Sequence, residues 1–317
     1  MTDVICPRRE LSAHGLRHEL FVYDDDDELL DRLVPWVQDG LDAGEPVLVI
    51  SRTASLNRIR DAVHAGDTGV TWLNGAELYT RPEAAIAGLD RVLRRHSVAG
   101  AVATRAIREL PRFRDESEWR PWLAYEAIAN RALAHHNAWV VCPSDSRVLP
   151  TSVLDGMYRT HPELLLETSR CNPLYEAPEL LVRELTPAPE PRLEGLRELG
   201  VAQDPRGFRD ALRREMDAAL VSDYDASKLL VAAGELYGEA YRNRAGLPAL
   251  CAGRVGDHFV CELTTPGAGH HDVLAGYVPP AARASDGTGM WVARQLTERL
   301  EIVHRPAAVT VRLWIAT

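Results

Sequence analysis

The first 185 residues alternate short apolar runs with amphipathic helical patterns, and this alternation constrains the fold more than any other feature. Apolar runs of strand length stand at 18–23, 46–50, 69–73, 99–107 and 138–143. Between the first two, apolar residues recur at helical spacing from Asp25 to Ala43, and Gly44 supplies a stop. Strands that alternate with helices pair in parallel through right-handed crossovers. The pattern therefore predicts a layered α/β domain with a mainly parallel sheet.

A proline-rich stretch divides the chain. Residues 184–195 read ELTPAPEPRLEG, and prolines at this density cannot continue a helix or a central strand. We therefore expect a first domain at 1–183, a linker at 184–195 and a second domain at 196–317. The second domain begins with two helical patterns and ends on the strand AVTVRLWIA. Its pattern predicts an α/β sandwich, with helices on one face of a mixed sheet.

Composition argues against several classes of function. The 46 acidic residues outnumber the 36 basic ones, and no basic block stands out, so a nucleic acid is a poor partner for this chain. No apolar run is long enough to cross a membrane and no signal peptide is evident, so we expect a cytoplasmic protein. The 5 cysteines are scattered without a C-x-x-C, which favours free thiols over disulfides or a zinc ribbon.

Five motifs in the first domain occur in the order of a known family. They are HELFVYDDDDELL, GLDAGEPVLVI, YEAIANRAL, VVCPSD and RTHPEL. Together they resemble the MEDS sensory domain over roughly residues 14–165. The resemblance implies a RecA-like core without its phosphate loop, and the chain indeed contains no G-x-x-x-x-G-K-[ST].

Four residues of these motifs are candidates for sensing a ligand. Glu126 and Asn130 share a helix face; they either face a pocket at the carboxyl end of the sheet or fix a neighbouring loop. Cys142 and Asp145 stand at the end of a strand, where a thiol either senses oxidants or is inert and buried. We expect His161 to be structural.

Other polar groups of the chain have simpler explanations. The run from Asp24 to Asp27 precedes a helix, where carboxylates meet the positive end of the helix dipole. The histidine pairs at 135–136 and 270–271 lack a third ligand at metal spacing, so no zinc site is expected there.

The last third contains two glycine pairs that follow an acidic helix. Gly267 and Gly269 lie in TTPGAG, Gly287 and Gly289 lie in DGTGMWVARQL, and the helix carries GELYGEAYRNRAG. This order resembles the GHKL ATP-binding fold (the Bergerat type, or HATPase) of histidine kinases and anti-sigma-factor kinases. The segment GTGMWVARQLTERLEI is most similar to the anti-sigma subgroup.

The resemblance assigns a role to each polar position of this second site, and two of them are substituted. Glu235 matches the general base, Glu239 replaces the asparagine that binds magnesium, and Thr265 replaces the aspartate that binds adenine. A second alignment pairs Glu239 with Asn243 one turn later. ATP with Mg²⁺, held at Glu239 or Asn243, is the implied cofactor. Losing the adenine contact alone costs about 1–3 kcal/mol, or about 10- to 100-fold in affinity. We therefore expect a pseudo-ATPase.

These observations predict a signalling regulator of the anti-sigma type. Its second domain would bind a sigma factor or a STAS anti-anti-sigma protein, and its first domain would control that binding in response to a small molecule. The helix segment FRDALRREM at 208–216 is a candidate homodimer face. One alternative is an active protein-serine kinase of a STAS partner. Another is a repurposed small-molecule-binding protein or enzyme.

Overall fold

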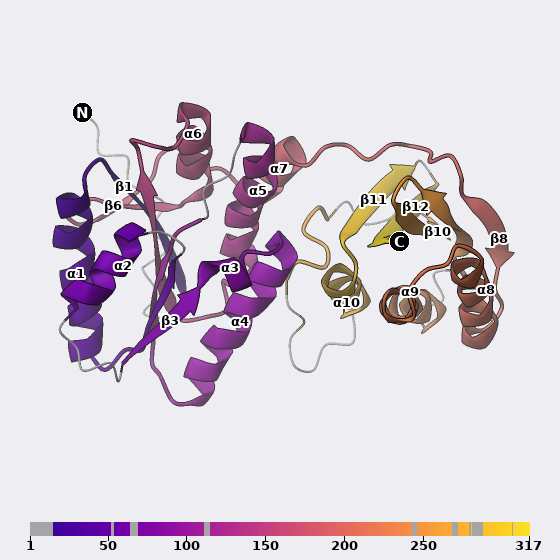
Figure 1. Ribbon diagram of the computed structural model, residues 1–317, viewed down its shortest axis with the longest axis horizontal. Coiled ribbons are helices and arrows are strands. Elements are labelled where there is room, and N and C mark those ends of the chain that lie inside the picture. The colour runs from indigo at the N-terminus through magenta and orange to yellow at the C-terminus, as the bar shows by residue number, and fades with distance from the viewer. Residues whose placement is uncertain are drawn as a thin grey trace. The chain divides into compact units, whose positions relative to one another are not determined.

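The computed structural model describes residues 15–51, 54–63, 69–110, 115–242, 246–267, 272–278, 280, 288–305 and 307–317. The chain forms two compact units, Met1–Thr186 and Pro187–Thr317 (Figure 1). The boundary lies inside the stretch expected to be a linker. Part of that stretch is helical, because helix α7 (Pro178–Leu185) includes its first two residues.

The first unit is built on a seven-stranded sheet in the order β3-β2-β4-β5-β1-β6-β7. Each neighbouring pair is parallel except β6 and β7, which are antiparallel. The strands are β1 (Leu16–Tyr23), β2 (Val47–Ser51), β3 (Val70–Asn74), β4 (Thr104–Arg108), β5 (Ala138–Asp145), β6 (Glu163–Leu165) and β7 (Ser169–Cys171). The predicted layered α/β fold with a mainly parallel sheet is confirmed. The short β6 and β7 were not predicted.

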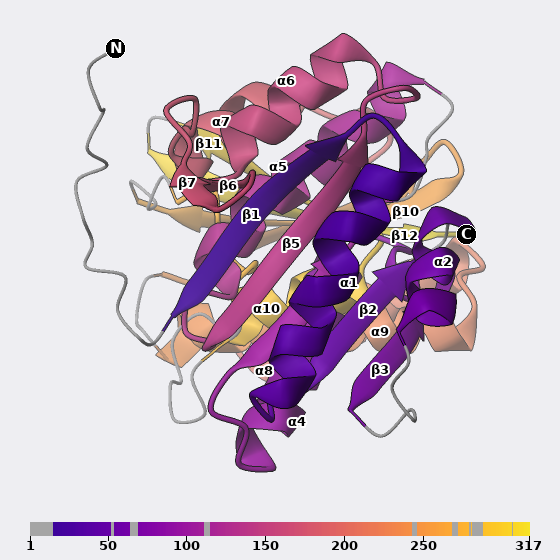
Figure 2. The same cartoon turned by 90° about the vertical axis from the view of Figure 1, so that its left-hand side faces the viewer.

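Helices cover both faces of this sheet. They are α1 (Asp26–Asp42), α2 (Ala54–Ala62), α3 (Gly75–Leu78), α4 (Pro82–Val98), α5 (Glu116–Ala132), α6 (Thr151–Thr160) and α7. Helix α1 lies across one face of the strands (Figure 2), where Leu33 and Val37 join the core formed with Val49 and Val141. The side chain of Asp25 accepts a hydrogen bond from the Glu28 amide and caps α1, as expected of the acidic run.

The second unit is a five-stranded sheet in the order β11-β12-β10-β9-β8, and every pair in it is antiparallel. The strands are β8 (Arg197–Val201), β9 (Ala249–Val255), β10 (His258–Pro266), β11 (Arg299–Arg305) and β12 (Ala308–Ala316), and the helices are α8 (Pro205–Ala218), α9 (Asp223–Arg242) and α10 (Thr288–Leu296). The expectation of a mixed sheet was wrong. Strands β8 and β11 were also missed. In β11, the segment RLEIVHR alternates along an edge strand that pairs with β12, whereas we expected it to continue the helix that begins near Gly289.

Helix α8 turns its apolar side into its own unit. Phe208, Leu212 and Met216 are almost completely buried and belong to one core with residues of α9 and the sheet. The segment 208–216 therefore presents a mainly charged surface to solvent. A homodimer through this helix would have to use polar contacts, because its apolar residues are already covered.

The face of this sheet away from that core is covered in part by the proline-rich segment. The Glu190 carbonyl accepts a hydrogen bond from Arg312, which is fully buried and also paired with Glu262. The Pro191 carbonyl accepts a second one from Arg305 at 2.8 Å. Beyond them the chain passes so close to β9 that a Cβ on Gly253 would lie 2.3 Å from the Gly195 carbonyl oxygen. Residues 190–195 are thus docked on the second unit rather than forming a free linker.

Gly253→Ala tests this docking. The added methyl group meets backbone that cannot move without releasing the segment, so we expect a loss of about 1–3 kcal/mol in the stability of the second unit. We also expect faster proteolysis near Arg192. Gly207→Ala is the matched control, since its Cβ would meet nothing closer than 3.6 Å. Unfolding in urea and timed tryptic digestion of the full chain measure both effects; equal behaviour of the two variants would contradict the docking.

Candidate functional site

Three neighbouring strands of the first unit place polar side chains on one face of the sheet. Leu20 of β1 pairs with Cys142 of β5, and His18 lies two residues before Leu20 on the same face. On the other side of β5, Ala106 pairs with Val140, so Arg108 at the end of β4 also shares that face. Alternation along parallel strands therefore brings His18, Arg108 and Cys142 together.

Helix α5 covers these residues and adds a carboxylate. Glu126 Oε2 lies 2.5 Å from Arg108 Nη2 and 3.2 Å from His18 Nε2. Cys142 Sγ lies 3.3 Å from the same His18 nitrogen and 3.5 Å from Arg108 Nη2. The Arg108 guanidinium also donates to the hydroxyl of Tyr125. All of these side chains are at least 98% buried. We call His18, Arg108, Glu126, Cys142 and His161 the buried cluster.

His161 closes the cluster from the end of α6. Its Nδ1 lies 2.7 Å from the Met157 carbonyl oxygen, which can only accept, so this nitrogen carries the proton. Its ring centroid is 4.1 Å from that of His18, and its Nε2 is 3.8 Å from Glu126 Oε2. His161 Nε2 and Glu126 Oε1 have no hydrogen-bond partner among the described residues.

Charges inside the cluster determine its protonation. Burial opposes ionisation of Cys142, but the Arg108 guanidinium and His18 outweigh it and lower the pKa of the thiol to about 6. Burial likewise opposes a charged His18, yet Cys142 and Glu126 raise the pKa of its imidazole to about 9. Burial would raise the pKa of Glu126, but Arg108 and His18 hold it at about 2. At neutral pH, two cations thus face a thiolate and a carboxylate.

The structure brings together three of the four predicted ligand-sensing residues. Glu126 and Cys142 belong to the buried cluster, and Asn130 holds it in place: its Oδ1 lies 3.0 Å from His18 Nδ1, and its Nδ2 donates to the Thr160 carbonyl at 2.8 Å. Asn130 therefore fixes the neighbouring chain while it also borders the site. Asp145 lies apart from the cluster and binds Arg147 Nε at 2.8 Å.

Sequence reasoning missed His18 and Arg108 and gave His161 only a structural role. A signal for Arg108 was available, since a charged residue at the carboxyl end of a buried strand needs a partner on the covering helix. His18 carried no comparable signal, because a histidine within HELFVY fits a strand equally well.

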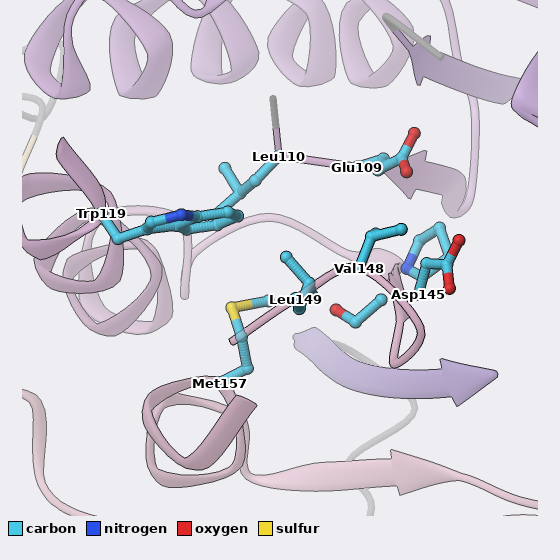
Figure 3. A pocket seen from close by; sticks show the side chains of 9 residues that line it. Glu109, Leu110, Trp119, Asp145, Val148, Leu149 and Met157 are labelled. Atoms are coloured by element: carbon cyan, nitrogen blue, oxygen red, sulfur yellow. The ribbon is translucent and has the colours of Figure 1, made fainter. Parts of the chain in front are cut away.

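A small pocket opens beside the cluster. It has about 330 Å³ of empty space, partly open to solvent. Leu110, Trp119, Leu149 and Met157 form its apolar lining, whereas Glu109 and Asp145 add carboxylates (Figure 3). Its walls continue directly from the cluster: Glu109 follows Arg108, Pro143 follows Cys142, and the Met157 carbonyl holds His161. The pocket lies at the carboxyl ends of β4 and β5, where open α/β folds bind ligands.

In the second unit, the start of α10 is seated on the acidic turn of α9. A Cβ on Gly289 would lie 2.7 Å from Glu239 Oε2 and 3.2 Å from the Glu235 carbonyl oxygen. A helix N-terminus attracts anions, and here a carboxylate of the protein itself lies against it. The described residues therefore fit the phosphates of Mg–ATP poorly.

The remaining predicted residues of this second site are only partly visible. Thr265 is half-buried on β10, opposite Val309. Gly267 has a φ of 115°, which favours glycine, and its amide donates to the Ala307 carbonyl. Asn243, Gly269 and Gly287 lie outside the described residues.

With this geometry established, comparison with known proteins identifies the first unit. Residues 17–162 match the family model of MEDS, the methanogen/methylotroph DcmR sensory domain. The resemblance predicted from the five motifs is therefore confirmed for this part of the chain. Residues 17–162 of the first unit thus match the MEDS sensory domain, and the buried cluster lies within the matched residues.

Other comparisons add little. A chain of the SiaB–SiaC complex from Pseudomonas aeruginosa is 14% identical, and the similarity covers 39% of this chain and 92% of that one with a TM-score of 0.29. A TM-score this low supports no argument about function. No curated protein matches the sequence. Among the described residues, no helix has both the length and the apolar character needed to cross a membrane.

The pKa of Glu126 predicts a pH-dependent effect of Glu126→Gln. Because its folded pKa of about 2 lies below the ordinary 4.5, ionised Glu126 stabilises the fold above pH 4.5, and this contribution is lost as the pH falls towards 2. At pH 7 the variant leaves Arg108 without its carboxylate and should lose about 3 kcal/mol. Urea unfolding of the full chain, fitted with a transition for each unit, should show the difference shrinking between pH 4.5 and 2. The control is Glu167→Gln, at an exposed site; a pH-independent difference would contradict the assignment.

Proposed function

We propose that this protein is a signalling regulator of the anti-sigma type. In this proposal the MEDS domain senses a small molecule, and the second unit holds a sigma factor or a STAS anti-anti-sigma protein. The observation that carries it is the buried cluster beside an open pocket within a matched sensory domain. The second unit contributes through its resemblance to anti-sigma GHKL domains.

The sensory role rests on how the pocket and the cluster are connected. The residues that line the pocket directly follow Arg108 and Cys142 along β4 and β5, so a ligand that shifts either strand end also shifts charges inside the cluster. Those charges are poorly solvated, and small displacements change their energies strongly. Ligand binding in the pocket would therefore change the packing of α5 and α6 on the sheet. This pair of helices is the element through which the signal would leave the domain.

The second unit would act by binding rather than by catalysis. Glu239 adds negative charge at the start of α10, and Thr265 cannot make the charge-assisted contact to adenine that aspartate makes. Both changes weaken nucleotide binding and leave the surface of the domain intact. We therefore place its function in partner binding.

Partner binding is tested with the purified full chain. Sigma factors and STAS proteins of the same organism are immobilised and titrated by biolayer interferometry, with an unrelated sigma factor as the control. We expect saturable binding to a member of one class, without ATP. Phosphorylation of a STAS serine by the chain would instead support the active kinase, and absence of binding to every member would contradict the proposal.

Reversing the two substitutions should restore nucleotide binding. Glu239→Asn removes the carboxylate from the start of α10, and Thr265→Asp restores the adenine contact. Calorimetric titration of Mg–ATP into the full chain should show at least tenfold tighter binding to the double variant than to the unaltered protein. Glu167→Asn is the control for the single variant Glu239→Asn, which loses one negative charge. If the unaltered chain binds Mg–ATP at micromolar concentration and Glu239→Asn does not, then Glu239 supports nucleotide binding and our interpretation of this residue is wrong.

A further inference from the structure

The buried cluster contains four side chains whose ligand atoms surround one point. His18 Nε2, Glu126 Oε2, Cys142 Sγ and the Nε2 of His161 all lie within 4.8 Å of one another. Three of the separations are 3.2, 3.3 and 3.8 Å. Zinc ligands at their usual distances of about 2.0–2.3 Å form a tetrahedron with edges of roughly 3.3–3.7 Å. The spacing therefore matches a four-coordinate metal centre.

The hydrogen bonds around the cluster orient both histidines as metal ligands. His161 donates from Nδ1 to the Met157 carbonyl. His18 Nδ1 faces Asn130 Oδ1, and the Asn130 amide is itself oriented because its Nδ2 donates to the Thr160 carbonyl. Each ring thus directs Nε2 into the cluster while an acceptor binds Nδ1. Outer-shell acceptors of this kind are typical of histidines that bind metals.

Two atoms inside the cluster make no hydrogen bond to any described residue. They are His161 Nε2 and Glu126 Oε1, and both are buried. Leaving such atoms unsatisfied is costly in an apolar interior. A cation at the centre would satisfy the His161 nitrogen directly and would draw the carboxylate into coordination.

We propose that His18, Glu126, Cys142 and His161 bind a divalent metal ion, with Zn²⁺ as the ion that fits this ligand set. Two imidazoles, one thiolate and one carboxylate are borderline ligands that suit zinc better than magnesium or calcium. The pocket is lined by Pro143 and Glu109, which directly follow Cys142 and Arg108 along the chain. The inference goes beyond the proposed function and does not depend on partner binding.

Arg108 determines how the ion would bind. Its Nη2 lies 2.5, 3.0 and 3.5 Å from the ligand atoms of Glu126, His18 and Cys142. The ion must displace this nitrogen, while Nη1 keeps its hydrogen bond to the Tyr125 hydroxyl. Any protons on the thiol and on His18 Nε2 leave to solvent. We expect weaker binding than at a closed structural zinc site, because the guanidinium competes for the same ligands.

Cobalt(II) titration of the metal-free full chain tests the proposal. We expect one Co²⁺ per chain, with the visible bands of tetrahedral cobalt and a sulfur-to-cobalt charge-transfer band in the near ultraviolet. Zn²⁺ should displace the cobalt and raise the melting temperature. Cys142→Ser should abolish the charge-transfer band. His161→Asn keeps a donor near the position of Nδ1 but lacks Nε2, and it should weaken binding at least tenfold.

The control is His136→Gln, in a second group formed by Asp90, His135 and His136. The expectation that this histidine pair lacks a third ligand was wrong, because Asp90 is close in the fold but distant in sequence. That group contains no sulfur, so the variant should leave the charge-transfer band unchanged. Circular dichroism shows whether each variant is folded, and the rise in melting temperature with Zn²⁺ provides a second readout. A band that survives Cys142→Ser, or folded protein that binds no metal, would overturn the proposal. If folded protein that binds no metal still binds a sigma factor or a STAS protein, the proposed function is unaffected.

Discussion

The interior of the first unit depends on the buried ion pair between Arg108 and Glu126. A guanidinium at the end of β4 has lost its water, and a carboxylate of α5 compensates for it at 2.5 Å. Burying two charges is expensive, and such pairs often stabilise a fold no better than apolar residues of the same volume. The pair therefore needs another explanation than stability. It holds a thiolate and an imidazolium in fixed positions, which a wholly apolar core could not do.

This constraint also explains why the site was only half visible in the sequence. Glu126 and Asn130 could be paired because helical spacing is local, and Cys142 and Asp145 could be placed because strand ends are recognisable. Arg108 and His18 join them only through the strand order β4-β5-β1, which is a property of the assembled sheet. His18 and Cys142 are 124 residues apart in sequence, and their spacing along the chain gives no sign that Nε2 and Sγ lie 3.3 Å apart in space.

The fold itself was more predictable than the site, and the errors have a common cause. The alternation of apolar runs with helical patterns was enough for the parallel core of the first unit. Strand β11 was missed because the resemblance of GTGMWVARQLTERLEI to a helical segment of anti-sigma GHKL domains was given more weight than the alternation of RLEIVHR. Similarly, the prolines of 184–195 suggested a free linker. Proline excludes regular structure but does not exclude docking, and Arg312 and Arg305 bind the carbonyl groups that such a segment leaves free.

Both units place protein charge where a ligand would otherwise bind, with different consequences. In the second unit Glu239 lies at the start of α10, so a phosphate would meet a fixed anion and be repelled. In the first unit Arg108 lies among ligands that a metal ion would need, but one of its nitrogens is held by Tyr125 and the other can leave. A carboxylate against a helix N-terminus is stabilised by the helix and has no reason to move. In the proposed metal site another cation displaces only Nη2 of Arg108, because Nη1 keeps its hydrogen bond to the Tyr125 hydroxyl. This difference agrees with the proposed division of roles, in which the first unit senses a small molecule and the second unit holds a partner.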